Sequence, residues 1–148
     1  LQNVLQMGID ALTGVVDELI RLEDNGTLSF GDYTADLKKK VPEFKVNDDI
    51  YYVKTFAEIT RLEKNGRLLL ESIPGSTVHN FSADERTASF TIEGTGDIRI
   101  TMELEPESEY RVVVDDFNIG SVNSGLSGKV SFSVDADGTE KAVKLEKM

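Results

Sequence analysis

The chain has 148 residues, with 16 Lys and Arg against 27 Asp and Glu, one His, and neither Cys nor Trp. The missing Cys excludes disulfides, thiolate nucleophiles and thiolate metal sites. A net charge of −11 argues against nucleic acid or an anionic membrane surface as the partner, since both would repel it. The length suits one domain, with or without an arm. No apolar run reaches membrane-spanning length and the start does not resemble a signal peptide, which favours a cytoplasmic or particle-associated protein.

The first segment has the periodicity of an amphipathic helix. Apolar residues follow a 4-3-4-3 spacing that places them on one helical face, and Asn25-Gly26 provides a C-terminal cap. We therefore predict an N-terminal helix over residues 1–26. Further apolar residues widen its face, so the helix is a candidate oligomerisation arm, and packing within the same chain is the alternative. The predicted interface residues are Leu5, Ile9, Leu12, Val16 and Leu19.

From Thr27 onward the apolar spacing falls mostly to two, which is typical of strands with one buried face. Turn residues separate the apolar runs. We expect an α+β, mainly β fold, in which residues 27–148 form an antiparallel β-sandwich or small barrel. The alternating runs are Leu28 and Phe30, then 88–92, 98–104, 110–114, 130–134 and 143–145.

A second, short helix is predicted near residues 56–64. Thr55 and Glu58 have the spacing of a capping box, Ile59 and Leu62 continue an apolar face, and Asn65-Gly66 follows. The motif R-L-E-x-N-G occurs both here and at residues 21–26. It indicates either a duplicated helix–turn–strand unit or two helix ends with the same capping residues.

Residue motifs give little sign of catalysis. His79 is the one side chain whose ordinary pKa lies near neutrality, and we interpret it as an inert loop or strand-end residue. Asp135-Ala-Asp137-Gly138 lacks the spacing of a calcium loop and is better explained as a hairpin turn. The acidic run Glu103–Glu109 fits a solvated strand end. We therefore predict no catalytic residue, no metal ligand and no cofactor.

Tyr51 and Tyr52 are weak candidates for ligand binding. Adjacent strand residues face opposite sides of a sheet, so one of the two rings is expected to be exposed. Such a ring can stack on a sugar, which makes the pair compatible with glycan binding.

Four segments together resemble a family of short clostridial gut-bacterial proteins that are labelled endosialidase or have no functional name. The segments are ELIRLEDNGTLSFGDY (18–33), YVKTFAEITRLEKNG (52–66), ESIPG (71–75) and YRVVVDD (110–116). The resemblance runs from about Glu18 to the C-terminus, and its label implies a link to glycans. It assigns no functional residue to this chain.

Three functions follow as hypotheses. The first is a non-enzymatic structural or interaction module that self-assembles, or docks on a larger protein assembly, through its apolar N-terminal helix. The alternative is a carbohydrate-binding module for a sialylated or other glycan. The third is a small glycan hydrolase, which requires two carboxylates at catalytic separation and one raised pKa.

Overall fold

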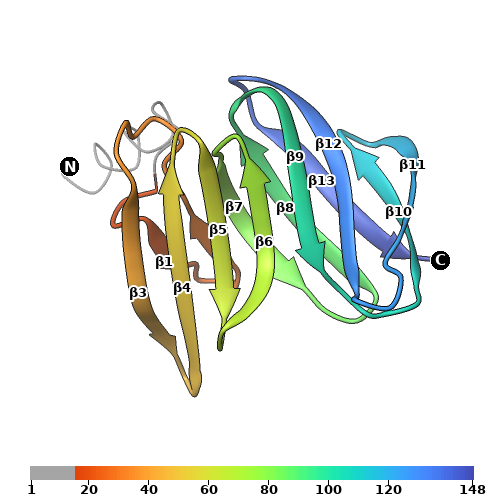
Figure 1. Cartoon of the computed structure of the whole chain (residues 1–148), viewed down its shortest axis with the longest axis horizontal. Helices are drawn as coiled ribbons and strands as arrows, with labels where there is room; N and C mark the ends of the chain where they lie inside the picture. The colour runs from red at the N-terminus through yellow and green to blue at the C-terminus, as the bar shows by residue number, and fades with distance from the viewer. Residues whose placement is uncertain (1–15) are drawn as a thin grey trace.

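The computed structural model describes residues 16–148, which form two antiparallel sheets packed face to face (Figure 1). Sheet A has seven strands in the order β1-β2-β7-β8-β13-β10-β11, and sheet B has six in the order β12-β9-β6-β5-β4-β3. The strands are β1 Ile20–Leu22, β2 Leu28–Phe30, β3 Lys39–Val46, β4 Asp49–Phe56, β5 Ile59–Lys64, β6 Arg67–Ile73, β7 Thr77–Ala83, β8 Thr87–Glu93, β9 Thr95–Glu103, β10 Glu109–Val114, β11 Phe117–Asn123, β12 Lys129–Asp137 and β13 Lys141–Lys147.

The predicted antiparallel sandwich is confirmed, and the barrel alternative is wrong because the two sheets stay separate. The alternating runs lie on β2, β8, β9, β10, β12 and β13. Their inward side chains meet between the sheets in one core, where Phe90, Ile100, Tyr110 and Leu145 are at most 4% exposed. No helix occurs between residues 16 and 148, so this part of the chain contains no helical membrane span.

The helix predicted over residues 1–26 is wrong for the part that the structure describes. Residues 16–19 form a turn in which the Leu19 amide bonds to the Val16 carbonyl, and Ile20–Leu22 is strand β1. Val16 is fully buried, and Leu19 is half-buried and packs against the core. Their predicted role at an oligomer interface stays a prediction. Leu5, Ile9 and Leu12 lie outside the described residues, and their predicted role stays a prediction.

The helix predicted at residues 56–64 is also wrong. Phe56 pairs with Ile59 across a tight turn. Thr55 therefore lies in β4 and Glu58 lies in the turn of a hairpin, and the two residues do not cap a helix. The burial alternates, with Thr60 and Leu62 inside, which is the period of a strand. Asn65 and Gly66 have positive φ values of 51° and 82°, as the two-residue turn between β5 and β6 requires.

The repeated R-L-E-x-N-G motif therefore marks two hairpins, β1–β2 and β5–β6, and not two helix ends. Asn and Gly adopt positive φ at low cost, so they serve helix ends and hairpin turns equally well. The hairpin predicted at Asp135–Gly138 is wrong as well, because β12 and β13 belong to different sheets.

Four connections between the sheets lie at one end of the sandwich, the upper end in Figure 1. They join β2 to β3, β6 to β7, β8 to β9 and β12 to β13. Gly75 sits in the second of these, where a Cβ atom would lie 1.9 Å from the Phe56 carbonyl oxygen. Only glycine allows the two backbones to approach this closely.

A chain of buried hydroxyl groups joins three of the segments at this end. The Asp32 amide donates to Thr55 Oγ1 (2.9 Å), and the Thr55 hydroxyl lies 2.8 Å from Thr60 Oγ1. Thr60 Oγ1 donates to the Ser76 carbonyl (2.7 Å) and accepts from the Ser76 amide (3.0 Å). Thr55, Thr60 and Ser76 are fully buried, so each bond satisfies a group that water cannot reach.

We predict that Thr60→Val lowers the free energy of unfolding by about 2–3 kcal/mol, because the Ser76 amide and carbonyl and the Thr55 hydroxyl lose their partner. Thermal unfolding should show a loss of roughly 5–10 °C for a chain of this length. Thr101→Val is the matched control, since Thr101 makes one half-buried bond to Ser131. Equal losses in the two variants would contradict a special role for the buried hydroxyl chain.

Candidate functional site

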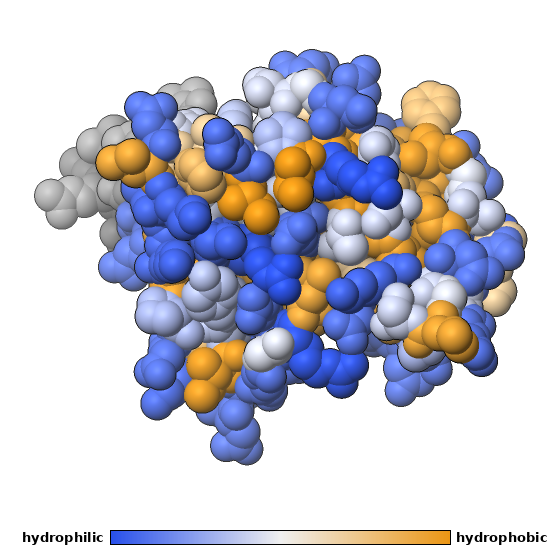
Figure 2. Space-filling model, in the orientation of Figure 1, coloured by the Kyte–Doolittle hydropathy of each residue, from blue (hydrophilic) through white to orange (hydrophobic). Residues whose placement is uncertain are grey.

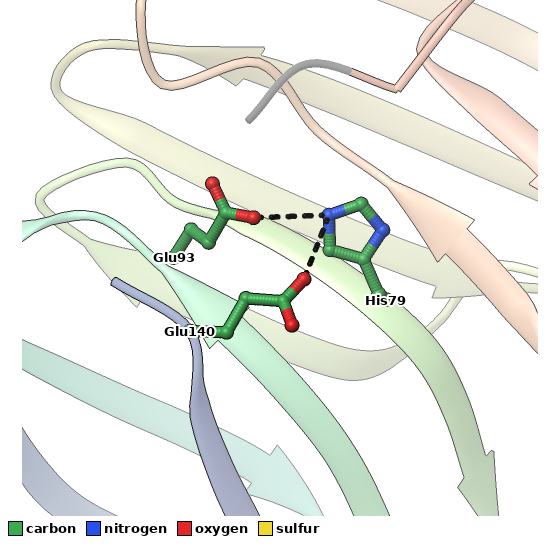
Figure 3. A group of neighbouring side chains, drawn as sticks. All are labelled: His79, Glu93 and Glu140. Atoms are coloured by element: carbon green, nitrogen blue, oxygen red, sulfur yellow. Dashed lines mark ion pairs between the residues drawn. The ribbon is translucent and has the colours of Figure 1, made fainter. Parts of the chain in front are cut away.

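The candidate site is a cluster of His79, Glu93 and Glu140 at the end where the four connections lie (Figure 3). His79 is on β7, Glu93 is the last residue of β8, and Glu140 immediately precedes β13. One potential ligand atom from each side chain lies within 4.8 Å of the others. The three side chains thus come from β7, from β8 and from the residue before β13, and these strands are neighbours in sheet A.

The register of sheet A places the three side chains on its outer face. Val78 and Ile92 pair with each other and are fully buried, so the following residues, His79 and Glu93, point to the opposite face. Lys141 pairs with Ile92, which puts Glu140 beside Glu93 at the next position along the two strands. His79 lies diagonally across from Glu93, because it pairs with Thr91.

A tight local turn positions Glu140. Asp137 Oδ1 accepts bonds from the amide and the hydroxyl of Thr139, at 3.1 and 2.6 Å. Gly138 has a φ of 87° and donates its amide to the Gly94 carbonyl at 2.8 Å. This contact fixes the β12–β13 connection against the end of β8 and brings Glu140 to Glu93.

A bulge in β7 positions His79. The register with β8 shifts between His79 and Ser82, and Asn80 adopts a φ of 55°. The Asn80 amide donates to Ser29 Oγ at 3.1 Å, which ties the bulge to β2. Bulges change the direction of neighbouring side chains, and they occur frequently beside functional sites.

Both carboxylates approach the same ring nitrogen. His79 Nε2 lies 3.5 Å from Glu93 Oε1 and 3.9 Å from Glu140 Oε1, as the dashed lines of Figure 3 show. The His79 and Glu93 side chains are 13% and 9% exposed, whereas Glu140 is 54% exposed. The cluster is therefore closed on the side of β7 and β8 and open to solvent at Glu140.

The charges in the cluster are poorly balanced. Burial of Glu93, together with the nearby negative charge of Glu140 and a hydrogen bond to it, raises the pKa of the Glu93 carboxyl from about 4.5 to about 7. Within residues 16–148, neither glutamate forms an ion pair with a lysine or an arginine. The same Glu93 charge and Asp32 add to the effect of burial in raising the pKa of Tyr33. Buried carboxylates are normally neutralised by a cation or by a metal ion.

The tyrosines that we considered for ligand binding lie elsewhere. Tyr51 packs against the core, and it lines a pocket together with Leu22 and Phe81. Tyr52 pairs with Glu63 in sheet B, whereas the cluster lies in sheet A. Both rings are half-buried, so neither offers a fully open stacking surface.

Sequence reasoning missed the cluster, although it singled out His79. Alternation around Val78 and Ile92 could have placed His79 and Glu93 on one face of a sheet. Nothing in the sequence shows that Glu140 joins them, because that proximity depends on which strand pairs with β8. The family models, the curated proteins and the solved structures compared with the chain contain no match. The resemblance to the clostridial family stays a prediction.

We predict that the metal-free protein loses stability as the pH rises through 7. Because the pKa of Glu93 is raised, the folded state keeps a proton that the unfolded chain releases above about pH 4.5. The free energy of unfolding should fall by roughly 3 kcal/mol at most between about pH 5 and pH 8. Urea titrations in the presence of a chelator measure this slope.

The neutral isostere Glu93→Gln should flatten that slope and unfold at higher urea concentration than the parent at pH 8. Glu58→Gln, in the exposed turn between β4 and β5, is the control and should leave the slope unchanged. A slope in Glu93→Gln as steep as that of the parent would show that other groups cause the pH dependence.

Proposed function

We propose that this chain is a non-enzymatic β-sandwich binding module whose functional centre is a divalent-cation site made by His79, Glu93 and Glu140. The observation that carries the proposal is the convergence of one imidazole nitrogen and two carboxylates within 4.8 Å. From the sequence we predicted no metal ligand, and the proposal differs from that prediction because the three residues meet only through strand pairing.

The distances suit a metal ion. Two ligand atoms that each lie about 2.1 Å from a tetrahedral zinc ion are about 3.4 Å apart. The separations from His79 Nε2 to Glu93 and Glu140 are 3.5 and 3.9 Å. Small side-chain rotations would bring both oxygens and the nitrogen into one coordination sphere, without movement of the strands.

The donor set indicates the class of cation. Imidazole suits zinc and other first-row transition metals, whereas calcium and magnesium prefer oxygen ligands alone. One nitrogen and two carboxylate oxygens therefore favour Zn²⁺ or Mn²⁺ over Ca²⁺ and Mg²⁺. Three protein ligands also leave a coordination position for water or for an acceptor group of a binding partner.

An ion bound at the site would also link separate segments of the sandwich. The site joins β7 and β8 to the connection that enters β13, so a bound ion would bridge two strands and one of the four inter-sheet connections at this end. A cation would neutralise the buried Glu93 carboxylate and remove its repulsion from Glu140. Binding to the folded state alone raises stability by mass action.

The two glycan hypotheses gain no support from the described residues. The raised pKa of Glu93 matches one requirement of a hydrolase. However, the Glu93 and Glu140 ligand atoms lie within 4.8 Å, closer than the about 5–9.5 Å that separates the two carboxylates of a glycosidase. The half-buried Tyr51 and Tyr52 do not favour sugar stacking either.

We predict that Zn²⁺ or Mn²⁺ raises the melting temperature of chelator-treated protein, while Ca²⁺ and Mg²⁺ do not. At a concentration about 100-fold above Kd, the ion should add about 2.7 kcal/mol, or roughly 5–10 °C for this length. Because His79 is the only histidine, its imidazole signals in an NMR spectrum report binding without ambiguity. Zn²⁺ should change the positions of these signals, and paramagnetic Mn²⁺ should broaden them, in proportion to the bound ion.

The matched variants are Glu140→Gln and Glu58→Gln. Glu140 is half-exposed, so its amide variant should fold, yet it should bind the ion at least about 10-fold more weakly in isothermal titration calorimetry. Glu58→Gln should bind like the parent. Unchanged imidazole signals at millimolar Zn²⁺ and Mn²⁺, or equal affinities in the two variants, would refute the site.

A further inference from the structure

The two sheets have four edge strands, and β11 differs from the other three. Sheet A ends in β1 and β11, and sheet B ends in β12 and β3. An edge strand exposes backbone amides and carbonyls that can pair with another chain, so proteins usually protect it with short length, charges or proline. The described edges can be compared on these features.

Three of the edges carry such protection. Strand β1 has only 3 residues. Strand β3 contains Pro42, three lysines and a register shift against β4. Strand β12 carries Lys129, Asp135 and Asp137. Strand β11 has 7 residues, Phe117–Asn123, without a charge or a proline, and it shares with β3 only a register shift against its neighbour.

The segment around β11 is also uncharged and apolar at its surface. Residues 117–128 contain no acidic or basic side chain, in a chain of which 29% is charged. Phe117 and Ile119 on β11 are 74% and 50% exposed, and Leu126 in the following loop is 85% exposed. Figure 2 shows hydrophobic side chains gathered at the right-hand end of the molecule, where Figure 1 places β10 and β11.

We propose that β11 is a self-association edge, on which a second copy of this chain adds its own β11 in antiparallel orientation. A net charge of −11 repels two copies over most of their surface, and the uncharged edge is where two copies can meet without facing like charges. A two-fold pair is self-complementary, so one apolar edge satisfies both subunits. Phe117 and Ile119 of each copy then lose their contact with water.

The centre of β11 is suited to a two-fold axis. Gly120 has no atom within 4 Å of the position that a Cβ would take, so another backbone can approach it. Its amide donates to Asn118 Oδ1 at 2.9 Å. A carbonyl of the second copy can replace that side chain. A register centred on Gly120 pairs Phe117 with Asn123 and Ile119 with Ser121.

Sedimentation velocity of the full chain between about 5 and 500 µM tests this proposal. The parent should pass from monomer to dimer over this range, whereas Ile119→Lys should raise the dimer dissociation constant at least 10-fold, because it places two lysines beside the symmetric pair. Ile50→Lys is the matched control, since Ile50 is 42% exposed on β4, away from this edge. It should dimerise like the parent.

Hydrogen exchange provides the second measurement. The outward amides of β11 should exchange at least 10-fold more slowly at 500 µM than at 5 µM in the parent, with no such change in Ile119→Lys. Thermal unfolding confirms that both lysine variants are folded. A parent that is monomeric throughout, or a dimer that Ile119→Lys leaves intact, would overturn the proposal, and neither result bears on the cation site.

Discussion

The close meeting of three backbone segments at one end of the sandwich is the constraint on which the rest of the structure depends. The bonds of the Thr55 and Thr60 hydroxyls to the Asp32 and Ser76 backbones, and the close backbone approach at Gly75, hold the β4–β5 hairpin against the two connections that enter β3 and β7. Buried polar groups need partners, and the Thr55 and Thr60 hydroxyls provide them for the backbone groups of Asp32 and Ser76.

The candidate site is a consequence of that arrangement. Strand β7 begins immediately after the locked connection, and Thr77, its first residue, pairs with Glu93. The β8–β9 and β12–β13 connections cross between the sheets at the same end, and the Gly138 amide bonds to the Gly94 carbonyl there. Two glutamates are thereby held side by side next to the only histidine. Like charges in register cost stability, and the proposed cation would neutralise them.

Local pattern predicted the strands better than it predicted the hairpins. The alternating runs around Phe90, Ile100, Val112 and Phe132 lie on strands, because each buries one face against a single core. The helix prediction for residues 56–64 was wrong because a capping box and a hairpin use the same polar residues. Over so short a segment, Ile59 and Leu62 also fit both the helix period and the strand period. Within residues 16–26 we expected a helix, but Ile20–Leu22 forms strand β1 because it pairs with β2.

By itself, the sequence determined that the chain is mainly β, an antiparallel sandwich or a small barrel, with an excess of acidic side chains and no thiol. The alternation of apolar residues and the composition can be seen without knowing the strand order, and they do not depend on it. Only the tertiary structure decided that β13 pairs with β8, and that β11 rather than β1 leaves a long uncharged edge. Glu140 meets Glu93 and His79 through that pairing. Contacts between strands 47 and 61 residues apart depend on loop paths and sheet order, which no local periodicity encodes.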